Sequence, residues 1–403
     1  PRLTPIVSLG RMPRVNAFLE VPRSGARLRA EPSYPLDLYF CERCTLVQLQ
    51  PLVSPALLFG TYAYLSSVSR TNRERLDAFA DELATRFALG AHSRILEIGS
   101  NDGTLLRSFQ RFTQNVVGVD PAKNVASLAA AAGVETIVDF FSPGVGADLA
   151  RTHGGFDLIL ALNVVAHTPD FVGLFSRARD LLAPGGRFVI EVVHVLQTLL
   201  RGEIDTVYHE HVYCFSLHAL LHAAKRAGLI IVDAEKIAAQ GGSLRIVMQR
   251  RQAKPRRRDR VAELVAEERD AGVHRASTYA SIAHHALALR LGIWSGLREL
   301  RKSADLVVGL GAPARGVVLM NYCGLTTADL DVVIDDTPLK QGKLVPGCHI
   351  PVGDWTRIPK DANIACLMFA WTYRSEILEK LRARTSHARV LIPLPAVEEV
   401  RFD

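Results

Sequence analysis

The chain has 403 residues, 48% of them hydrophobic and 22% charged. This composition suits two or three folded domains and excludes disordered, collagen-like and repetitive proteins. The net charge of +7 suits an anionic ligand such as a nucleotide diphosphate, or a nucleic-acid surface, and does not choose between them. The densest basic run, residues 254–260, has no aromatic neighbours and no accompanying nucleic-acid motif. We therefore expect a solvent-exposed linker there and no nucleic-acid partner.

The cysteines indicate the compartment. Six are spread over the chain and only Cys41 and Cys44 lie close together, which is not a disulfide framework. Neither a signal peptide nor a membrane-length apolar run is recognisable. We predict a cytoplasmic protein without a membrane partner, and we expect its natural start upstream of Pro1 because that residue is not methionine.

Residues 1–70 are rich in proline and turns and carry the CxxC pair, which alone is a weak metal signal. They are predicted to form a small domain. Residues 72–87 follow with apolar side chains at helical spacing, which predicts one helix.

From residue 94 the pattern changes to alternating strands and helices, which is typical of a parallel sheet covered on both faces. Strands are predicted at residues 94–98, 116–119, 136–138, 156–161, 187–193, 229–237 and 243–249. The last two form a hairpin that adds an antiparallel strand at or near one edge. Seven strands in this order predict the Rossmann-like α/β sheet of class I methyltransferases.

A second α/β region follows the basic linker. Residues 260–303 predict one or two long helices, and strands are expected at residues 306–310, 332–334, 364–369 and 390–392. The predicted domains are thus residues 1–70, 71–252 and 253–403, the last being a second Rossmann-like α/β domain.

The segment ILEIGSNDG, residues 95–103, predicts a nucleoside site because a strand runs directly into a loop with Gly99 and Gly103. Its spacing is not the G-x-G-x-x-G of dinucleotide sites, in which the middle glycine admits a pyrophosphate. Glu97 and Asp102 would repel a pyrophosphate, but they suit the ammonium and sulfonium charges of S-adenosylmethionine (SAM). The sequence therefore favours SAM over NAD.

The ends of the following strands add polar groups to the same edge of the sheet. Asp120, before Pro121, can accept hydrogen bonds from ribose hydroxyls. Asp139 and Phe140 follow the third strand, where a carboxylate and a ring could meet the adenine, and Asn163 ends the fourth. The predicted cofactor contacts are Glu97, Gly99, Asn101, Asp102, Gly103, Asp120, Pro121, Asp139, Phe140 and Asn163.

The densest cluster of titratable groups is Tyr208-His209-Glu210-His211. If the segment is extended, Tyr208 shares a face with Glu210, and His209 with His211. A carboxylate next to an imidazole suits general-base catalysis. The HEH spacing is too short for the zinc-protease motif H-E-x-x-H.

On these residues the chain resembles the deoxysugar C-methyltransferases, which act on nucleotide-linked 4-keto-6-deoxysugars in antibiotic biosynthesis. The resemblance covers nearly the whole chain. It is carried by NAFL, the CxxC pair, residues 62–67, ILEIGSNDGTLL, NVVAH, DTVYHEH, GGSLR, GAPARG, NYCG and DDTPLKQGKLVPGCHIPV.

The resemblance implies an N-terminal zinc-binding domain, a SAM-binding middle domain and a C-terminal α/β domain, with the nucleotide sugar in the cleft between them. The family's zinc site has two CxxC pairs. Cys41 and Cys44 would supply one pair, and the other is expected before Pro1. We therefore expect a structural zinc in the complete protein.

The resemblance also implies the chemistry. A base removes the proton next to the C4 ketone, and the enolate carbon takes the methyl group of SAM. His211 is the expected base, with Glu210 as its partner or as an alternative base, and Tyr208, Tyr62 and His167 orient the sugar or stabilise the enolate oxygen. Contacts to the sugar nucleotide are expected from Arg245, Arg315 (where the family usually has lysine), Asn321 and Tyr322.

The leading hypothesis is therefore C-methylation of a TDP-linked 4-keto-6-deoxysugar, at C3 or C5, by a monomer or weak dimer. Three alternatives stay open. The same base could activate a hydroxyl for O-methylation. An NAD-dependent oxidoreductase could use residues 309–316 as its dinucleotide loop, although that loop lacks a clear acidic residue at the right distance. Finally, the protein could bind a nucleotide without catalysis.

Overall fold

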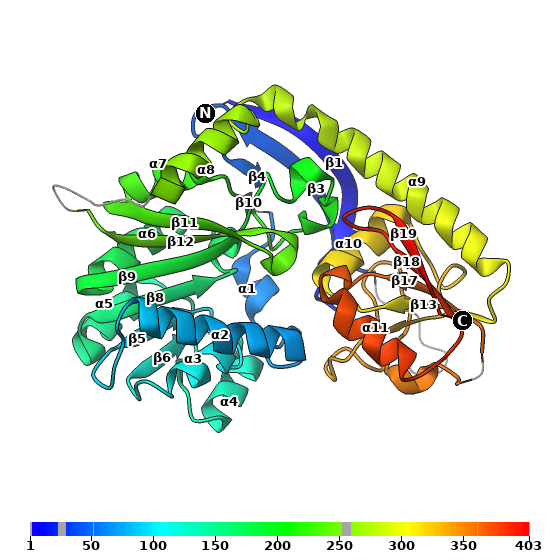
Figure 1. The fold of residues 1–403 in the computed structure, drawn as a ribbon, viewed down its shortest axis with the longest axis horizontal. Coiled ribbons are helices and arrows are strands. Elements are labelled where there is room, and N and C mark those ends of the chain that lie inside the picture. The colour runs from blue at the N-terminus through cyan, green and yellow to red at the C-terminus, as the bar shows by residue number, and fades with distance from the viewer. Residues whose placement is uncertain (1, 23–29, 51, 252–258, 361, 403) are drawn as a thin grey trace. The chain divides into compact units, whose positions relative to one another are not determined.

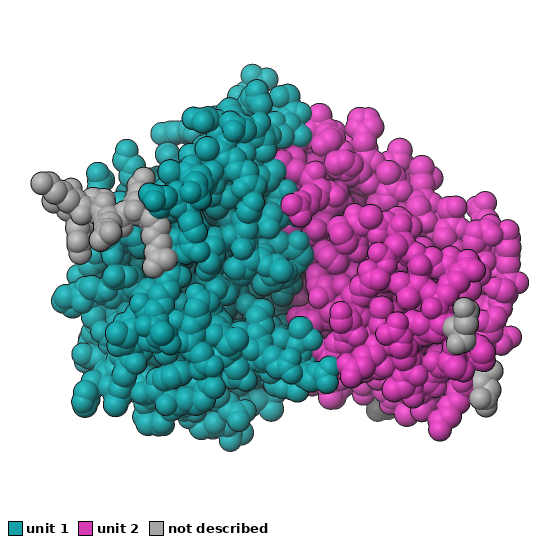
Figure 2. Space-filling model, in the orientation of Figure 1, with its two compact units in different colours: residues 1–4, 40–197, 212–278 teal, residues 5–39, 198–211, 279–403 magenta. Residues whose placement is uncertain are grey.

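The structure is a computed structural model that describes residues 2–22, 30–50, 52–251, 259–360 and 362–402. Most of the predicted basic linker, residues 254–258, therefore lies outside the described residues. Two compact units make up the chain (Figure 2). Unit 1 comprises residues 1–4, 40–197 and 212–278, and unit 2 comprises residues 5–39, 198–211 and 279–403. Among the described residues, no helix combines the length and hydrophobicity that a membrane crossing requires.

Unit 1 contains a seven-stranded sheet in the order β11-β12-β9-β8-β5-β6-β7 (Figure 1). The neighbouring pairs among β7, β6, β5, β8 and β9 are parallel, whereas β12 is antiparallel to both β9 and β11. This arrangement confirms the predicted class I methyltransferase sheet with its reversed last strand. The strands are β5 (Ile95–Ile98), β6 (Val116–Val119), β7 (Glu135–Ile137), β8 (Phe156–Leu162), β9 (Leu182–Val193), β11 (Leu229–Ile237) and β12 (Ser243–Arg250).

Helices cover both faces of this sheet, as its mostly apolar strands require. One hydrophobic core joins α2 (Arg70–Arg86), α3 (Thr104–Phe109) and α4 (Lys123–Ala131) to one face. A second core lies on the other face and includes α5 (Pro143–His153), α6 (Phe171–Leu181), α7 (Leu217–Arg226) and α8 (Asp259–Asp270). The predicted helix at residues 72–87 is α2, which begins two residues earlier because Ser69 caps it by accepting a hydrogen bond from the Asn72 amide.

Unit 2 contains a six-stranded sheet in the order β16-β14-β13-β17-β18-β19. All neighbours are parallel except β18 and β19. The predicted second α/β region is thus present, but its two edge strands, β16 and β19, were not predicted from the sequence. The elements are α9 (Ser281–Arg301), β13 (Leu306–Leu310), α10 (Ala314–Cys323), β14 (Val332–Ile334), β16 (Val352–Gly353), β17 (Ile364–Met368), α11 (Arg374–Arg382), β18 (Ala388–Ile392) and β19 (Glu398–Phe402).

The N-terminal residues are shared between the units. In unit 2, β2 (Leu19–Glu20) pairs with β15 (Lys343–Leu344). In unit 1, β4 (Val47–Leu49) pairs with β10 (Tyr213–Cys214). Residues 198–211 also belong to unit 2, although the strands β9 and β10 on either side of them belong to unit 1. The division into residues 1–70, 71–252 and 253–403 stays a prediction. Contacts between Cα atoms divide the chain into the two units given above.

Candidate functional site

The glycine loop follows β5 and has three residues in the left-handed region: Gly99 (φ +71°), Asn101 (φ 51°) and Gly103 (φ +75°). A Cβ atom on Gly99 would lie 2.3 Å from Cγ2 of Val164, which follows β8. Glycine is therefore required at position 99 both by its backbone conformation and by this close approach. The side chain of Asn101 makes hydrogen bonds that stabilise its left-handed backbone conformation.

Buried carboxylates surround this loop. Glu97 is 5% exposed, and its Oε2 atom has no hydrogen-bond partner among the described residues. Burial, with the nearby charges of Asp102 and Asp120, raises the pKa of Glu97 well above its ordinary value. Because an unpaired buried carboxylate is costly, this group suits a ligand that brings a positive charge. The fit agrees with the ammonium and sulfonium groups of SAM.

Asp120 lies at the end of β6, where the sequence places it. Its Oδ2 atom accepts a hydrogen bond from the Asn101 amide, and its Oδ1 atom accepts one from the Ala122 amide, both at 2.9 Å. Burial raises its pKa despite these two bonds. Each carboxylate oxygen keeps a further lone pair for a ribose hydroxyl.

The other predicted cofactor residues lie at the same edge of the sheet. Asp139 and Phe140 are exposed and follow β7, and Asn163 follows β8 in the left-handed region (φ 56°). Pro121 is half-buried after β6. The carboxyl ends of four parallel strands thus bring the predicted set together, as the topology of open α/β sheets requires.

Residues 62–67, here called the strap, are fastened to this edge by side-chain amides. Asn124 of α4 accepts a hydrogen bond from the Tyr62 amide at 3.0 Å and donates one to the Tyr62 carbonyl at 2.7 Å. Asn101 does the same for the Tyr64 carbonyl (3.1 Å) and the Ser66 amide (2.9 Å). The sequence reading missed Asn124, because only the fold brings it next to Tyr62.

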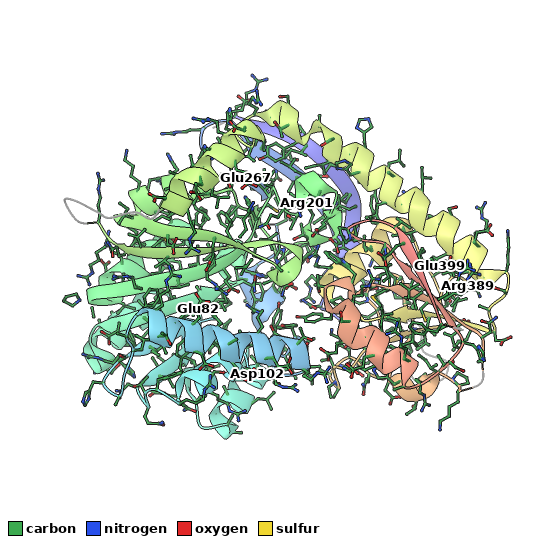
Figure 3. The ribbon with its side chains drawn as sticks, viewed as in Figure 1. Glu82, Asp102, Arg201, Glu267, Arg389 and Glu399 are labelled. Atoms are coloured by element: carbon green, nitrogen blue, oxygen red, sulfur yellow. The ribbon has the colours of Figure 1, made fainter. Side chains whose placement is uncertain are left out.

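Asp102 completes the fastening of the strap. Its Oδ2 atom accepts a hydrogen bond from the Ser67 amide at 3.0 Å, and its position after β5 can be followed in Figure 3. The strap residues are only half-buried, so hydrogen bonds rather than core packing hold them. The glycine loop therefore positions the segment that carries Tyr62.

Tyr62 and His167 both contact the ring of Phe59, which ends α1 (Pro55–Phe59). The ring centroids lie 5.7 Å and 5.4 Å apart, in edge-to-face geometry. Burial lowers the pKa of His167 to about 4. Its imidazole is therefore neutral at physiological pH.

The Tyr208–His211 segment is a turn, closed by a 2.8 Å hydrogen bond from the His211 amide to the Tyr208 carbonyl. The extended conformation considered from the sequence, which would put His209 beside His211, is therefore wrong. The turn instead brings together the rings of Tyr208 and His211, whose centroids are 4.0 Å apart. The alternation expected of an extended strand does not apply to this segment, because the turn sets the directions of its side chains.

The hydrogen bonds of His211 assign its tautomer. Its Nδ1 atom lies 2.8 Å from the Thr206 carbonyl oxygen, which can only accept, so Nδ1 carries the proton in the neutral ring. The Nε2 atom lies 2.7 Å from the Tyr208 hydroxyl and accepts a hydrogen bond from it. Nε2 is therefore the basic atom of this histidine.

His209 and Glu210, which lie between Tyr208 and His211 in the turn, contact other parts of unit 2. Glu210 accepts a 2.7 Å hydrogen bond from the side-chain amide of Asn16, in the NAFL motif. His209 donates from Nε2 to the Tyr34 carbonyl at 3.2 Å. Burial lowers the pKa of His209, so this ring is neutral. Asn16 is a second residue that the sequence reading did not assign to the site.

Arg245, predicted to contact the sugar nucleotide, lies in an ion-pair network of unit 1. Its guanidinium donates two hydrogen bonds to Glu191, at 2.9 and 3.0 Å, and one to Glu82, at 2.9 Å. It also lies over the ring of Phe79, 3.9 Å from the centroid. Figure 3 shows Glu82 on α2 beside the sheet. The network occupies the donors that a diphosphate would need.

The remaining predicted substrate residues lie on α10. Arg315 pairs with Glu203 and Asp205. Asn321 donates hydrogen bonds to two backbone carbonyls, those of Val317 (2.9 Å) and Pro346 (3.0 Å). Tyr322 is half-buried under the guanidinium of Arg290.

The CxxC pair forms a tight turn in which the Thr45 amide donates to the Cys41 carbonyl at 2.9 Å. Burial alone would raise the pKa of the Cys41 thiol, but hydrogen bonds from the backbone amides of Cys44 and Arg43 outweigh it and lower this pKa. Such amides favour a thiolate at Cys41, whereas burial raises the pKa of Cys44, so the assignment of the pair as zinc ligands rests on the CxxC spacing. Within the described ranges, no group of three or more metal-ligating side chains is present.

Family models match three parts of the chain. The model described as "Putative zinc binding domain" matches residues 1–59, "Methyltransferase domain" matches residues 69–234, and "C-methyltransferase C-terminal domain" matches residues 238–395. The C-methyltransferase NovU of Streptomyces niveus is 34% identical over 366 residues, which are 91% of this chain and 87% of the relative.

Other proteins match smaller shares of the chain. A ubiquinone biosynthesis O-methyltransferase of Azorhizobium caulinodans is 36% identical over 135 residues, which are 30% of this chain and about half (52%) of the relative. Among solved structures, magnesium protoporphyrin IX methyltransferase from Synechocystis PCC 6803 with bound SAM shares 14% identity at a TM-score of 0.34, covering 44% of this chain and 79% of that chain. A SAM-dependent methyltransferase from Clostridium acetobutylicum shares 12% identity at a TM-score of 0.35, covering 45% of this chain and 92% of that chain. The fold assignment itself rests on the strand order.

Proposed function

Because the chain belongs to the SAM-dependent deoxysugar C-methyltransferase family, we propose that it methylates C3 or C5 of a TDP-linked 4-keto-6-deoxysugar. The single observation that carries this proposal is the hydrogen bonding of the His211 ring. Its Nδ1 proton is fixed on a backbone carbonyl and its basic Nε2 atom faces the Tyr208 hydroxyl. A neutral imidazole held in one tautomer is suited to removing a proton from carbon.

SAM supplies the electrophilic methyl group. Glu97 and Asp120 would hold its charged and ribose groups at the carboxyl edge of the unit 1 sheet, and Asp139 and Phe140 would contact the adenine. The orphaned Glu97 Oε2 atom supports this assignment, because a cationic ligand removes the cost of leaving it unpaired.

The C4 ketone of the sugar acidifies the neighbouring C–H bond. His211 Nε2 takes that proton, and the bonding electrons move into the enolate. The enolate carbon then forms a bond to the methyl carbon as the sulfur–methyl bond breaks. The Tyr208 hydroxyl must leave the Nε2 lone pair before Nε2 takes the proton, and it can then donate to the enolate oxygen. Glu210 would act as partner or alternative base, with Tyr62 and His167 orienting the sugar.

For the nucleotide diphosphate, Tyr322 remains the proposed contact, whereas both amide hydrogens of Asn321 are donated to backbone carbonyls. Arg245 and Arg315 have their guanidinium groups in ion pairs with the protein's own carboxylates, so the proposal does not depend on them. Zinc, held by Cys41 and Cys44 with further ligands, would have a structural role. A monomer or weak dimer without a nucleic-acid partner, in the cytoplasm, stays a prediction.

For the NAD-dependent alternative, the fold supplies an acidic residue that the sequence did not show. Asp335, at the end of β14, stands where a dinucleotide site has its ribose-binding acid. Its Oδ2 atom accepts a 2.7 Å hydrogen bond from the Ala312 amide and lies 3.4 Å from Lys340 Nζ. The Lys340 charge and these hydrogen bonds lower the pKa of Asp335 despite its burial. Like Asp120, Asp335 fastens its loop through backbone amides, but Lys340 shares its Oδ2 atom, which leaves less room there for a ribose hydroxyl.

The test is incubation of the protein with SAM and a TDP-4-keto-6-deoxysugar, followed by NMR location of the new methyl group. A methyl group on C3 or C5 supports the proposal, a methyl group on oxygen establishes O-methylation, and binding without transfer indicates a silent nucleotide-binding protein. In deuterated water without SAM, exchange of the α-proton should occur with the wild type and be lost in His211→Gln. Absence of methyl transfer to any keto sugar would overturn the proposal.

A further inference from the structure

Residues 203–211, here called the catalytic loop, carry the proposed base and belong to unit 2 together with α10. Three side chains of this loop bond to distant parts of the unit. Glu210 bonds to Asn16, and Glu203 and Asp205 bond to Arg315. The loop is thus held at its beginning by the C-terminal α/β sheet domain.

The contact at Arg315 is a buried ion cluster. Arg315 Nη2 lies 3.0 Å from Glu203 Oε2 and 2.6 Å from Asp205 Oδ1. Trp371 Nε1 donates to the other oxygen, Asp205 Oδ2, at 2.9 Å. The Arg315 guanidinium also lies over the Trp371 ring, 4.8 Å from the centroid. The exposed fractions of Arg315, Glu203 and Asp205 are 7%, 2% and 0%.

This cluster occupies the loop that follows β13, where a Rossmann-like domain usually takes a phosphate. Here the first turn of α10 presents Arg315 to carboxylates of the same chain. Burial opposes the charge of Arg315, but Asp205 and Glu203 outweigh it and raise its pKa, so the guanidinium stays charged. Buried charges are retained only when paired, which makes Asp205 and Arg315 dependent on one another.

The cluster is linked to the proposed base by the backbone. Asp205 directly precedes Thr206, whose carbonyl oxygen accepts the Nδ1 proton of His211. Moving Asp205 therefore moves the group that fixes the tautomer of the imidazole. A released imidazole would no longer be obliged to keep its lone pair on Nε2.

We propose that Arg315 is a positioning residue: with Trp371 it holds Asp205, and thereby sets the tautomer and orientation of His211, rather than binding the diphosphate. This inference rests on the proposed function for the role of His211. It gives the C-terminal domain a direct part in catalysis, because α10 and the segment after β17 fix the loop that carries the base.

The test uses the full chain with Arg315→Met, Arg315→Lys and Trp371→Phe, with Arg382→Met as the control. Arg382 is an exposed arginine of α11 that lies over the Phe402 ring. We expect Arg315→Met to lower kcat at least about 30-fold and SAM-independent proton exchange to a similar extent. Arg315→Lys should recover part of the loss, because lysine can still pair with one carboxylate. Trp371→Phe, which keeps an aromatic ring, should lose about 3- to 10-fold. Arg382→Met should lose nothing.

A second readout does not depend on activity. Nitrogen chemical shifts of isotopically labelled histidine, with the His211 signals assigned by His211→Gln, report which ring nitrogen carries the proton. We expect Nδ1–H in the wild type and Arg382→Met, and a mixture of tautomers in Arg315→Met and Trp371→Phe. Circular dichroism and SAM affinity show that each variant is folded.

The outcomes separate the two proposals. If the wild type transfers no methyl group but the tautomer shifts as expected, the proposed function fails and the positioning role stands. An unchanged tautomer in a folded Arg315→Met and in Trp371→Phe overturns the positioning role. A raised KM for the sugar nucleotide with unchanged kcat would instead identify Arg315 as a substrate ligand.

Discussion

At the scale of single residues, buried carboxylates in the two units show how one residue type serves two purposes. Glu97 is left without a partner for its Oε2 atom, which prepares it for a cation. Glu203 has a partner in Arg315, yet burial still raises its pKa to about 7. In both cases burial is the largest cause of the raised pKa. The two groups differ in that Glu203 has an ion-pair partner, whereas Glu97 Oε2 is left for a ligand.

The Glu203→Gln variant should be more stable than the wild type above pH 7. The folded pKa of Glu203, about 7, exceeds its ordinary value of 4.5, so the folded state binds more protons and loses stability as pH rises between these values. Glutamine removes that dependence. Urea unfolding at pH 5 and pH 8 should show the variant's advantage growing with pH. An advantage that is equal at both values contradicts the burial argument.

Binding of SAM should release protons through Glu97. Burial and two neighbouring carboxylates raise its pKa in the free protein, and a bound cation lowers it again. Calorimetry in buffers of different ionisation enthalpy should detect this release at pH values near the raised pKa. Glu97→Gln should abolish it, whereas Glu135→Gln, which changes an exposed carboxylate of β7, should retain it. Release that survives in Glu97→Gln would assign it to another group.

At the scale of elements, the strap shows how a cofactor loop can position a distant catalytic side chain. Four of its backbone groups bond to the side chains of Asn124 and Asn101. The strap is only half-buried, and the Tyr62 ring also packs edge-to-face on Phe59 and Tyr64. The amide groups therefore couple the glycine loop and α4 to the position of Tyr62.

Removing one of these amides gives a direct test. Asn124→Ala should lower methyl transfer about 10-fold and leave SAM affinity within about 3-fold, because it frees the Tyr62 backbone without touching the proposed cofactor contacts. Asn115→Ala is the matched control, since Asn115 is exposed and its side chain donates to the Ala91 carbonyl. Equal effects of the two substitutions would mean that the strap does not position Tyr62.

The elements also show what the sequence could and could not predict. The strands of the unit 1 sheet and the four inner strands of the unit 2 sheet were predictable because apolar runs between turn signals depend on local pattern. The edge strand β19 was missed because residues 398–402 are mostly polar and form a strand only by pairing with β18. The carboxyl-edge residues of the cofactor site follow from strand order alone. The partners Asn16, Asn124 and Trp371 do not, since each is separated from its contact by many residues.

At the scale of the whole molecule, the proposed roles fall into different units. The predicted SAM contacts lie in unit 1, and the proposed base lies in unit 2. Binding of the methyl donor and removal of the proton should therefore be separable by mutation. Separate loss of the two steps is stronger evidence for the site than loss of activity alone, because it assigns each step to its own residues.

Asp139→Ala and His211→Gln provide the pair of variants. Asp139 is exposed, so its loss should leave the fold intact, weaken SAM binding about 10-fold and leave SAM-independent proton exchange unchanged. His211→Gln should show the reverse: wild-type SAM affinity and no exchange. An Asp139→Ala variant that loses exchange as well would place the two functions in one coupled site that mutation cannot divide.

Mixing the two variants then tests whether one chain suffices. A protein that works as a monomer or weak dimer completes both steps within one chain, so the mixture should show no more methyl transfer than the sum of the separate variants. Restored activity would require unit 1 of one chain to act with unit 2 of another. Because each variant keeps one intact unit, restoration would contradict the monomer prediction while leaving the assignment of the base and the cofactor site in place.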